Sequence, residues 1–62
     1  MQAWFYAFQI INEDRTVSFQ GDGTFGSNRT DTHELVEEQR AIVASKASVM
    51  PENVLFTAFN KL

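Results

Sequence analysis

Residues 3–11, Ala-Trp-Phe-Tyr-Ala-Phe-Gln-Ile-Ile, are a nearly continuous apolar stretch. Aromatic and β-branched side chains of this kind favour a pleated, half-buried strand. Successive side chains of a strand point to opposite faces, and here both faces are apolar. One face carries Trp4, Tyr6, Phe8 and Ile10, and the other carries Ala3, Phe5, Ala7 and Ile11. Because two apolar faces are typical of a strand covered on both sides, we predict the central strand of a small sheet.

A weaker strand pattern follows this stretch. Residues 16–20 alternate between apolar and polar side chains, as expected for an edge strand. The polar residues 12–15 favour a turn, so we expect the two strands to form a hairpin. Residues 21–30 are rich in Gly, Ser, Asn and Thr and are predicted to form a loop. We expect Phe25, an isolated aromatic residue in that loop, to fold back onto the core.

The next segment has the signals of a helix. Asp31 is a good N-cap, and Glu34 follows three residues later, as in a capping box. Apolar residues share one face at helical spacing: Leu35, Val36, Ile42, Val43 and Ala47. Gln39 falls near this face and is expected to be half-buried. The helix should end near Ser48, because Pro51 disfavours helical backbone at the residue before it.

Residues 54–61 have the pattern of a third strand, in which strict alternation places Phe56 and Phe59 on opposite faces. A right-handed crossover from the second strand to the third carries the helix over the first strand. We therefore predict a single domain, residues 1–62, of the α+β class. Its two layers are a three-stranded antiparallel sheet in the order 2-1-3 and one helix, in the sequence strand-strand-helix-strand.

One helix covers only one face of such a sheet. The face of Ala3, Phe5 and Ala7 leaves room for close approach, so we assign the helix to it. The opposite face then points away from the helix with its aromatic side chains: Trp4, Tyr6 and Phe8. Exposed aromatic patches mark binding or self-association. We expect these residues to bind a partner or to hold a homodimer together, unless the loop of residues 21–30 covers them.

Composition narrows the classes of function. The chain has 62 residues, no cysteine and one histidine, which disfavours disulfides and metal sites. We expect no metal and no cofactor. The N-terminus lacks a basic leader, and the longest apolar run is about half the ~20 residues of a membrane-spanning helix. We therefore expect a cytoplasmic protein without membrane contact. The net charge of −3 argues against direct nucleic-acid binding.

Two patterns suggest catalysis or nucleotide binding but lack the necessary context. Residues 21–26 match G-x-G-x-x-G, yet no lysine-bearing strand or catalytic loop follows and no helix opens directly after the motif. A general base at His33 would need a nucleophile and an orienting group, and Asp31, which is near it in sequence, is better placed to cap the helix. We predict that the protein is not an enzyme.

The acidic residues suggest a binding surface instead. Asp31, Glu34 and Glu38 share one stripe of the predicted helix, and Glu37 lies beside it. Carboxylates in a row can occupy a groove built for nucleic-acid phosphates. The alternative is a solvated helix face, whose acidic side chains are stabilised by the positive N-terminal end of the helix dipole. We take Asp31, Glu34, Glu37 and Glu38 as candidate residues for binding a partner protein.

An acidic, cysteine-free chain of this length, with a small sheet on one helix, resembles phage- or prophage-encoded accessory proteins. In layout it is similar to small anti-CRISPR inhibitors, some of which act as acidic mimics of DNA. The resemblance covers the whole chain in size, charge and element order. It implies a viral protein that acts in the host cytoplasm.

The functional hypothesis is a non-enzymatic inhibitor that occludes a surface of a larger nucleic-acid-handling complex, of the anti-CRISPR or anti-restriction type. One alternative is a small homo-oligomeric structural or regulatory protein whose sheet face self-associates. Another is a single-stranded nucleic-acid binder that stacks bases on the sheet aromatics.

Overall fold

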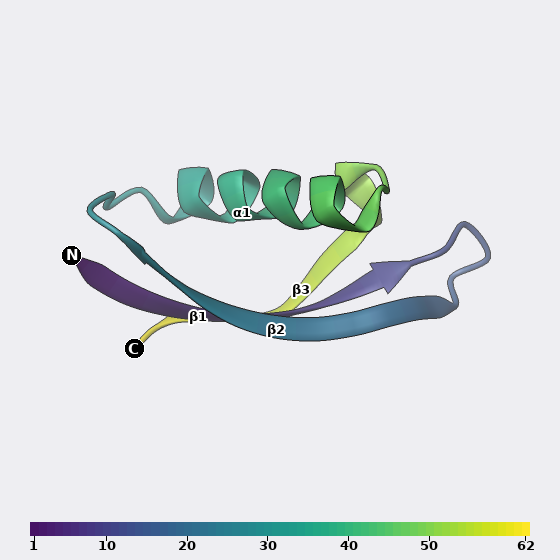
Figure 1. Ribbon diagram of the computed structural model, residues 1–62, viewed down its shortest axis with the longest axis horizontal. Coiled ribbons are helices and arrows are strands. Elements are labelled where there is room, and N and C mark those ends of the chain that lie inside the picture. Colours follow the sequence, from purple (N-terminus) through teal and green to yellow (C-terminus); the bar gives the residue numbers. More distant parts are fainter.

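The predicted strands and helix are all present in the computed structural model, which describes residues 1–62. The elements are β1 (Gln2–Ile11), β2 (Val17–Ser27), α1 (Thr32–Ala47), the short 3-10 helix η1 (Pro51–Asn53) and β3 (Val54–Lys61). The strands form one antiparallel sheet in the order β2-β1-β3, and α1 lies along one face of it (Figure 1). The predicted α+β class and strand order are therefore confirmed. Neither helix has the length and apolar character needed to cross a membrane.

The prediction of which sheet face the helix covers was wrong. Trp4 and Ile10 are only 4% and 2% exposed, and Ile10 packs with Val43 and Ala44 of α1. Tyr6 and Phe8 pack against the same core cluster. The large side chains of this face offer more apolar area than the alanine-rich face, and stabilisation grows with the apolar area removed from water. The stabilisation from burying the aromatic face therefore exceeds what closer packing of the helix on the alanine-rich face would give.

An aromatic layer lies on the covered face of the sheet. Trp4 stacks on Phe25 with ring centroids 6.3 Å apart and planes at 9°, and it lies 5.6 Å from Phe59. Tyr6 meets the edge of Phe56 at 5.6 Å. The predicted folding of Phe25 onto the core is confirmed. A one-residue register shift in β3 brings Phe56 and Phe59 to the same face, against the strict alternation expected from sequence.

The strand β2 extends well beyond its predicted end. It continues to Ser27, so residues 21–27 are strand and not loop. None of its glycines has a positive φ. Gly21 is paired with Phe8 and Gly23 with Tyr6, and a Cβ at Gly23 would lie 2.9 Å from the Tyr6 hydroxyl oxygen. The glycines therefore leave space for aromatic rings that lie over β2.

Both ends of α1 are capped, and the N-cap Asp31 and the end near Ser48 are as predicted. The Asp31 carboxylate accepts hydrogen bonds from the backbone N–H groups of His33 and Glu34, at 3.0 and 3.3 Å. The helix ends at Ala47, and Ser48 follows in the left-handed region with φ 57°. The buried side chains of α1 are Leu35, Gln39, Val43 and Ala44. Gln39 is thus more deeply buried than expected.

Candidate protein-binding surfaces

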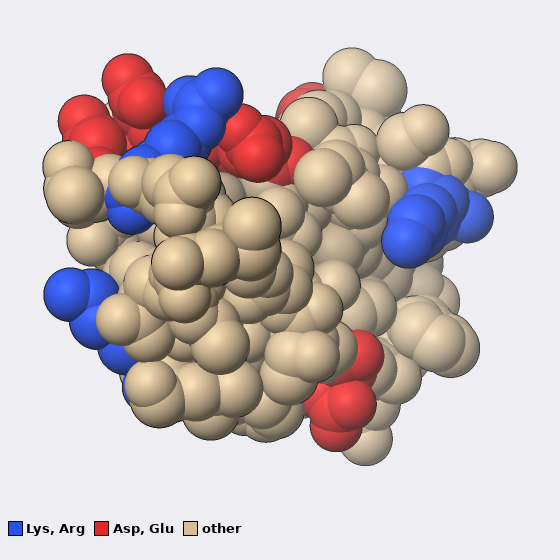
Figure 2. Space-filling view, turned by 60° about the vertical axis from the view of Figure 1, so that its left-hand side comes forward, with Lys and Arg blue, Asp and Glu red and all other residues tan.

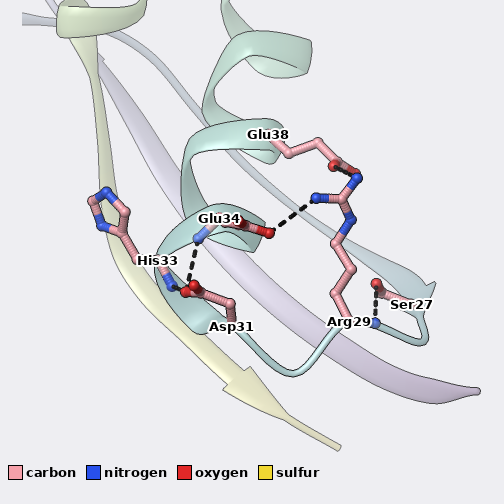
Figure 3. A network of polar contacts seen from close by, with 6 residues as sticks. All are labelled: Ser27, Arg29, Asp31, His33, Glu34 and Glu38. Carbon is pink, nitrogen blue, oxygen red and sulfur yellow. Dashed lines mark hydrogen bonds and ion pairs between the residues drawn. The ribbon is translucent and has the colours of Figure 1, made fainter.

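The candidate acidic residues gather on the outer side of α1, above the sheet. Figure 2 shows acidic side chains along the top of the view with a basic group among them. The basic group closest to them is Arg29, whose Nη1 lies 3.2 Å from Glu34 Oε2 and whose Nη2 lies 3.4 Å from Glu38 Oε2 (Figure 3). Glu34 and Glu38 are one helical turn apart, so a single guanidinium bridges both carboxylates.

The backbone before α1 positions this arginine. The backbone N–H of Arg29 donates to the Ser27 hydroxyl oxygen at 3.1 Å, close to the end of β2. The Arg29 side chain then reaches across to α1 (Figure 3). The side chains of Arg29, Glu34 and Glu38 remain 55%, 58% and 44% exposed. Exposed pairs of this kind contribute about 0–1 kcal/mol each, so they orient the carboxylates more than they stabilise the fold.

The other two candidate acids also have partners. Asp31 caps the helix, and Glu37 Oε1 lies 3.5 Å from Arg40 Nε. Arg40 is itself anchored, because it donates to the Val54 carbonyl and lies 5.4 Å from the Phe56 ring. The four carboxylates therefore share their surface with two guanidinium groups. The result is a mixed-charge surface and not a row of free carboxylates.

Sequence reasoning missed both arginines. Glu37 and Arg40 are three residues apart, a spacing that pairs side chains on a helix and was visible in the sequence. Arg29 lies before the helix, and only the path of the chain brings it to Glu34 and Glu38. His33 is exposed, and its ring points away from the Arg29 network (Figure 3).

The sheet aromatics predicted to bind a partner do not form an open patch. Trp4 is buried, and Tyr6 and Phe8 line a groove of about 590 Å³ between β2 and the C-terminal half of α1. A helix is about 10 Å across and strands are about 4.8 Å apart, so one helix covers about two of the three strands. The groove lies over the strand that α1 leaves uncovered.

The groove is mainly apolar. Its lining includes Tyr6, Phe8, Ile10, Phe19, Val43 and Val49. Lys46 of α1 also lines it, whereas Asp22 borders it from β2 but is paired with Ala7, so the Asp22 side chain lies on the opposite face of the sheet. Phe19 is 59% exposed, and its ring centroid lies 6.1 Å from that of Phe8.

The face of the sheet turned away from α1 is mixed in character. Phe5 is paired with Asn60, and Gln9 is paired with Leu55, which is 51% exposed. Side chains that are directly paired across strands share a face, so Phe5 and Leu55 each have a polar neighbour, whereas Ala7 is paired with Ala58 and Ile11 with Val17. This face is a weaker apolar patch than the one expected from sequence.

The chain matches no protein-family model, and no curated protein or solved structure is significantly similar to it.

Proposed function

We propose that the protein is a non-enzymatic binding protein that docks the acidic half of α1 on a basic surface of a larger protein. The observation that carries this proposal is the exposed set Glu34, Glu37 and Glu38. Arg29 and Arg40 hold these carboxylates in place before any partner arrives. Such preorganisation lowers the entropy that ordering long side chains would otherwise cost on binding.

The target class that we propose is a complex that handles nucleic acid, of the type inhibited by anti-CRISPR or anti-restriction proteins. Such complexes present lysine and arginine to phosphates, so they offer basic surfaces to an acidic protein. The support is the resemblance in size, charge and layout, together with the acidic helix. The predicted phage origin and host-cytoplasmic location stay predictions.

The arginines favour occlusion over close imitation of a DNA backbone. A DNA mimic needs an unbroken series of negative charges, whereas here Arg29 lies between Glu34 and Glu38. We propose that the partner forms ion pairs with particular carboxylates and that the body of the protein blocks the nucleic-acid path. Complementary charge would also speed the encounter and make it sensitive to salt.

The test compares two variants that lose the same charge. Glu37→Gln/Glu38→Gln removes two carboxylates from α1, and Glu13→Gln/Glu52→Gln removes two exposed carboxylates that form no ion pair. Each immobilised protein captures partners from a bacterial lysate, and the captured protein is then purified for titration. We expect the helix variant to lose binding to the partner and the control variant to retain it. We also expect double-stranded DNA to compete with the protein for the partner.

Two outcomes contradict the proposal. One is a partner that binds the Glu37→Gln/Glu38→Gln variant as tightly as the wild type. The other is binding that persists unchanged at 1 M salt, where charge interactions act over only about 3 Å.

The alternative of base stacking on the sheet has lost its main support. It required Trp4, Tyr6 and Phe8 on an open face, and these residues face α1. The homo-oligomer alternative also assumed an open sheet face, and it stays a prediction.

A further inference from the structure

The outer edge of β2 is open along the strand. β2 is an edge strand of 11 residues, and its only neighbour in the sheet is β1. It runs the length of the sheet in Figure 1. The backbone N–H and C=O groups on its outer side have no partner within the sheet, and an edge of this kind is a template for pairing with another strand.

Proteins usually protect such an edge, and β2 lacks the usual protection. A short strand, a bulge, a proline or a lysine discourages pairing with another chain. β2 has no Pro, Lys or Arg, its only charged residue is Asp22, and residues 19–27 pair with β1 without a register shift. The other edge differs, because β3 is shorter, carries Lys61 and a register shift, and its Val54 carbonyl accepts from Arg40. This contrast indicates that β2 is the edge available for pairing.

We propose that a second copy of this chain pairs with this edge, so that two β2 strands run antiparallel and the two sheets become one continuous sheet. The pairing is centred on Gly23 and uses residues 19–27 of each copy. A two-fold axis at Gly23 makes the two halves of the interface identical. This register overlaps the whole regular part of β2, whereas a register centred on Asp22 would set two carboxylates directly opposite each other.

The polar side chains of β2 match those of a second copy in this register. Asp22 lies opposite Thr24 of the second copy, twice per dimer, and a Thr24 hydroxyl can donate to each carboxylate. Both side chains lie on the face turned away from α1, because Asp22 is paired with Ala7 and Thr24 with Phe5.

The other face of the joined strands matches as well. Phe25 lies opposite Gly21 of the second copy, and the Phe8 ring lies over that glycine, 3.0 Å from where its Cβ would be. The aromatic layer of one sheet therefore continues into the layer of the other. A strand of another protein would satisfy both faces only by chance, whereas β2 of a second copy always does.

The proposed interface is compatible with the proposed function but does not rest on it. The two-fold axis places both α1 helices on the same face of the continuous sheet. Because α1 leaves β2 uncovered, the two helices do not meet over the joined strands. Glu34, Glu37 and Glu38 lie on the outer side of α1, so the dimer carries two acidic helix surfaces.

The first test measures mass by sedimentation equilibrium and compares the same substitution at the two edges. Thr24 of β2 and Asn60 of β3 are both exposed and are both paired with Phe5. Thr24→Glu places a carboxylate opposite Asp22 of the second copy, twice per dimer. We expect it to raise the dissociation constant about tenfold, whereas Asn60→Glu should leave the constant unchanged.

Thr24→Lys tests the same contact by strengthening it, so its effect cannot come from a damaged fold. It places a cation opposite Asp22 and should lower the dissociation constant, and circular dichroism checks the fold of each variant. A wild type that remains monomeric at millimolar concentration overturns the proposal. So does a dimer that Thr24→Glu and Asn60→Glu weaken equally, or one that Thr24→Lys weakens.

The second test follows amide hydrogen exchange of the wild type, residue by residue, above and below the dissociation constant. In the proposed dimer the outward N–H groups of residues 19–27 form hydrogen bonds, so they should exchange slowly at high concentration and fast after dilution. The outward N–H groups of β3 should exchange at the same rate in both samples. A dimer in which the outward N–H groups of β2 exchange as fast as in the monomer overturns the proposed arrangement.

Discussion

Substitution of Gly23 tests why β2 contains glycine. A Cβ at this position would lie 2.9 Å from Tyr6 Oη and 3.0 Å from Cζ, closer than ordinary van der Waals contact. The rings of Phe8, Phe25 and Phe56 pack around the Tyr6 ring, with centroids 6.0, 6.1 and 5.6 Å from its own, so the ring can retreat only toward the groove and loses these contacts when it does. We therefore expect Gly23→Ala to strain the aromatic layer.

The magnitude follows from two opposing terms. Overpacking costs about 1–3 kcal/mol, and replacing glycine by alanine returns about 0.4–1 kcal/mol through the unfolded chain. The net expectation for Gly23→Ala is a loss of about 1–2 kcal/mol. Gly26→Ala is the matched control, because its Cβ would meet the side chain of Met1, which is 91% exposed and free to move. Gly26→Ala should leave stability unchanged or raise it by about 0.5 kcal/mol.

Urea unfolding at one protein concentration measures both variants. With a slope of about 1 kcal/mol per molar, the midpoint of Gly23→Ala should fall by about 1 M or more relative to Gly26→Ala. Tyr6→Phe removes the atom closest to the new Cβ and should recover part of the loss in the double variant. Equal midpoints for Gly23→Ala and Gly26→Ala would refute the argument that the glycines make room for the rings.

Three further predictions concern stability. Leu35→Ala should cost about 2–5 kcal/mol by urea unfolding, because Leu35 is fully buried and its loss leaves a cavity. Asp31→Ala should cost about 1 kcal/mol in the same assay, because two backbone N–H groups of α1 lose their acceptor, whereas Asp31→Asn should cost less. Hydrogen bonds from the Thr16 hydroxyl and then from its backbone N–H lower the pKa of Asp14 from its usual 3.8. The charged carboxylate therefore stabilises the fold above that pH. This contribution is lost as the pH falls through the lowered pKa of the folded state. The unfolding midpoints of wild type and Asp14→Asn should therefore differ at neutral pH and converge in acid below about pH 4, and a constant difference would contradict this role.

Local signals predicted the elements of this fold well. The third strand was predicted as residues 54–61 and spans Val54–Lys61, and α1 begins after the predicted N-cap Asp31. Each of these predictions depends on residues within one turn or one strand. The hairpin follows from the turn residues 12–15, and the strand order then follows from the crossover rule.

The errors concern interactions between distant residues. Both faces of β1 are apolar, so alternation alone could not decide which face α1 covers, and the larger aromatic area decided it. Gly21 and Gly23 have poor strand propensity and were assigned to a loop. They are strand because Phe8 and Tyr6 lie over them from β1, a contact that no local pattern reveals.

The candidate site was predicted in part. The acidic side chains of α1 were identified from sequence, and the structure places them together on its outer side. Their pairing with Arg29 was not predicted, because the chain between β2 and α1 sets that contact. The groove exists because one helix is narrower than three strands. This difference appears only when the helix and the sheet pack together, so local sequence patterns do not predict the groove.

The central structural claim is that α1 covers the aromatic face of the sheet, and for this reason we propose the outer side of α1, and not the sheet aromatics, as the binding surface. Trp4 is the only tryptophan and is 4% exposed beneath this layer, so its fluorescence tests the claim directly. At concentrations low enough to dissociate any dimer, we predict blue-shifted emission that acrylamide quenches poorly until urea unfolds the chain. Emission and quenching like those of free tryptophan in the native protein would contradict the account.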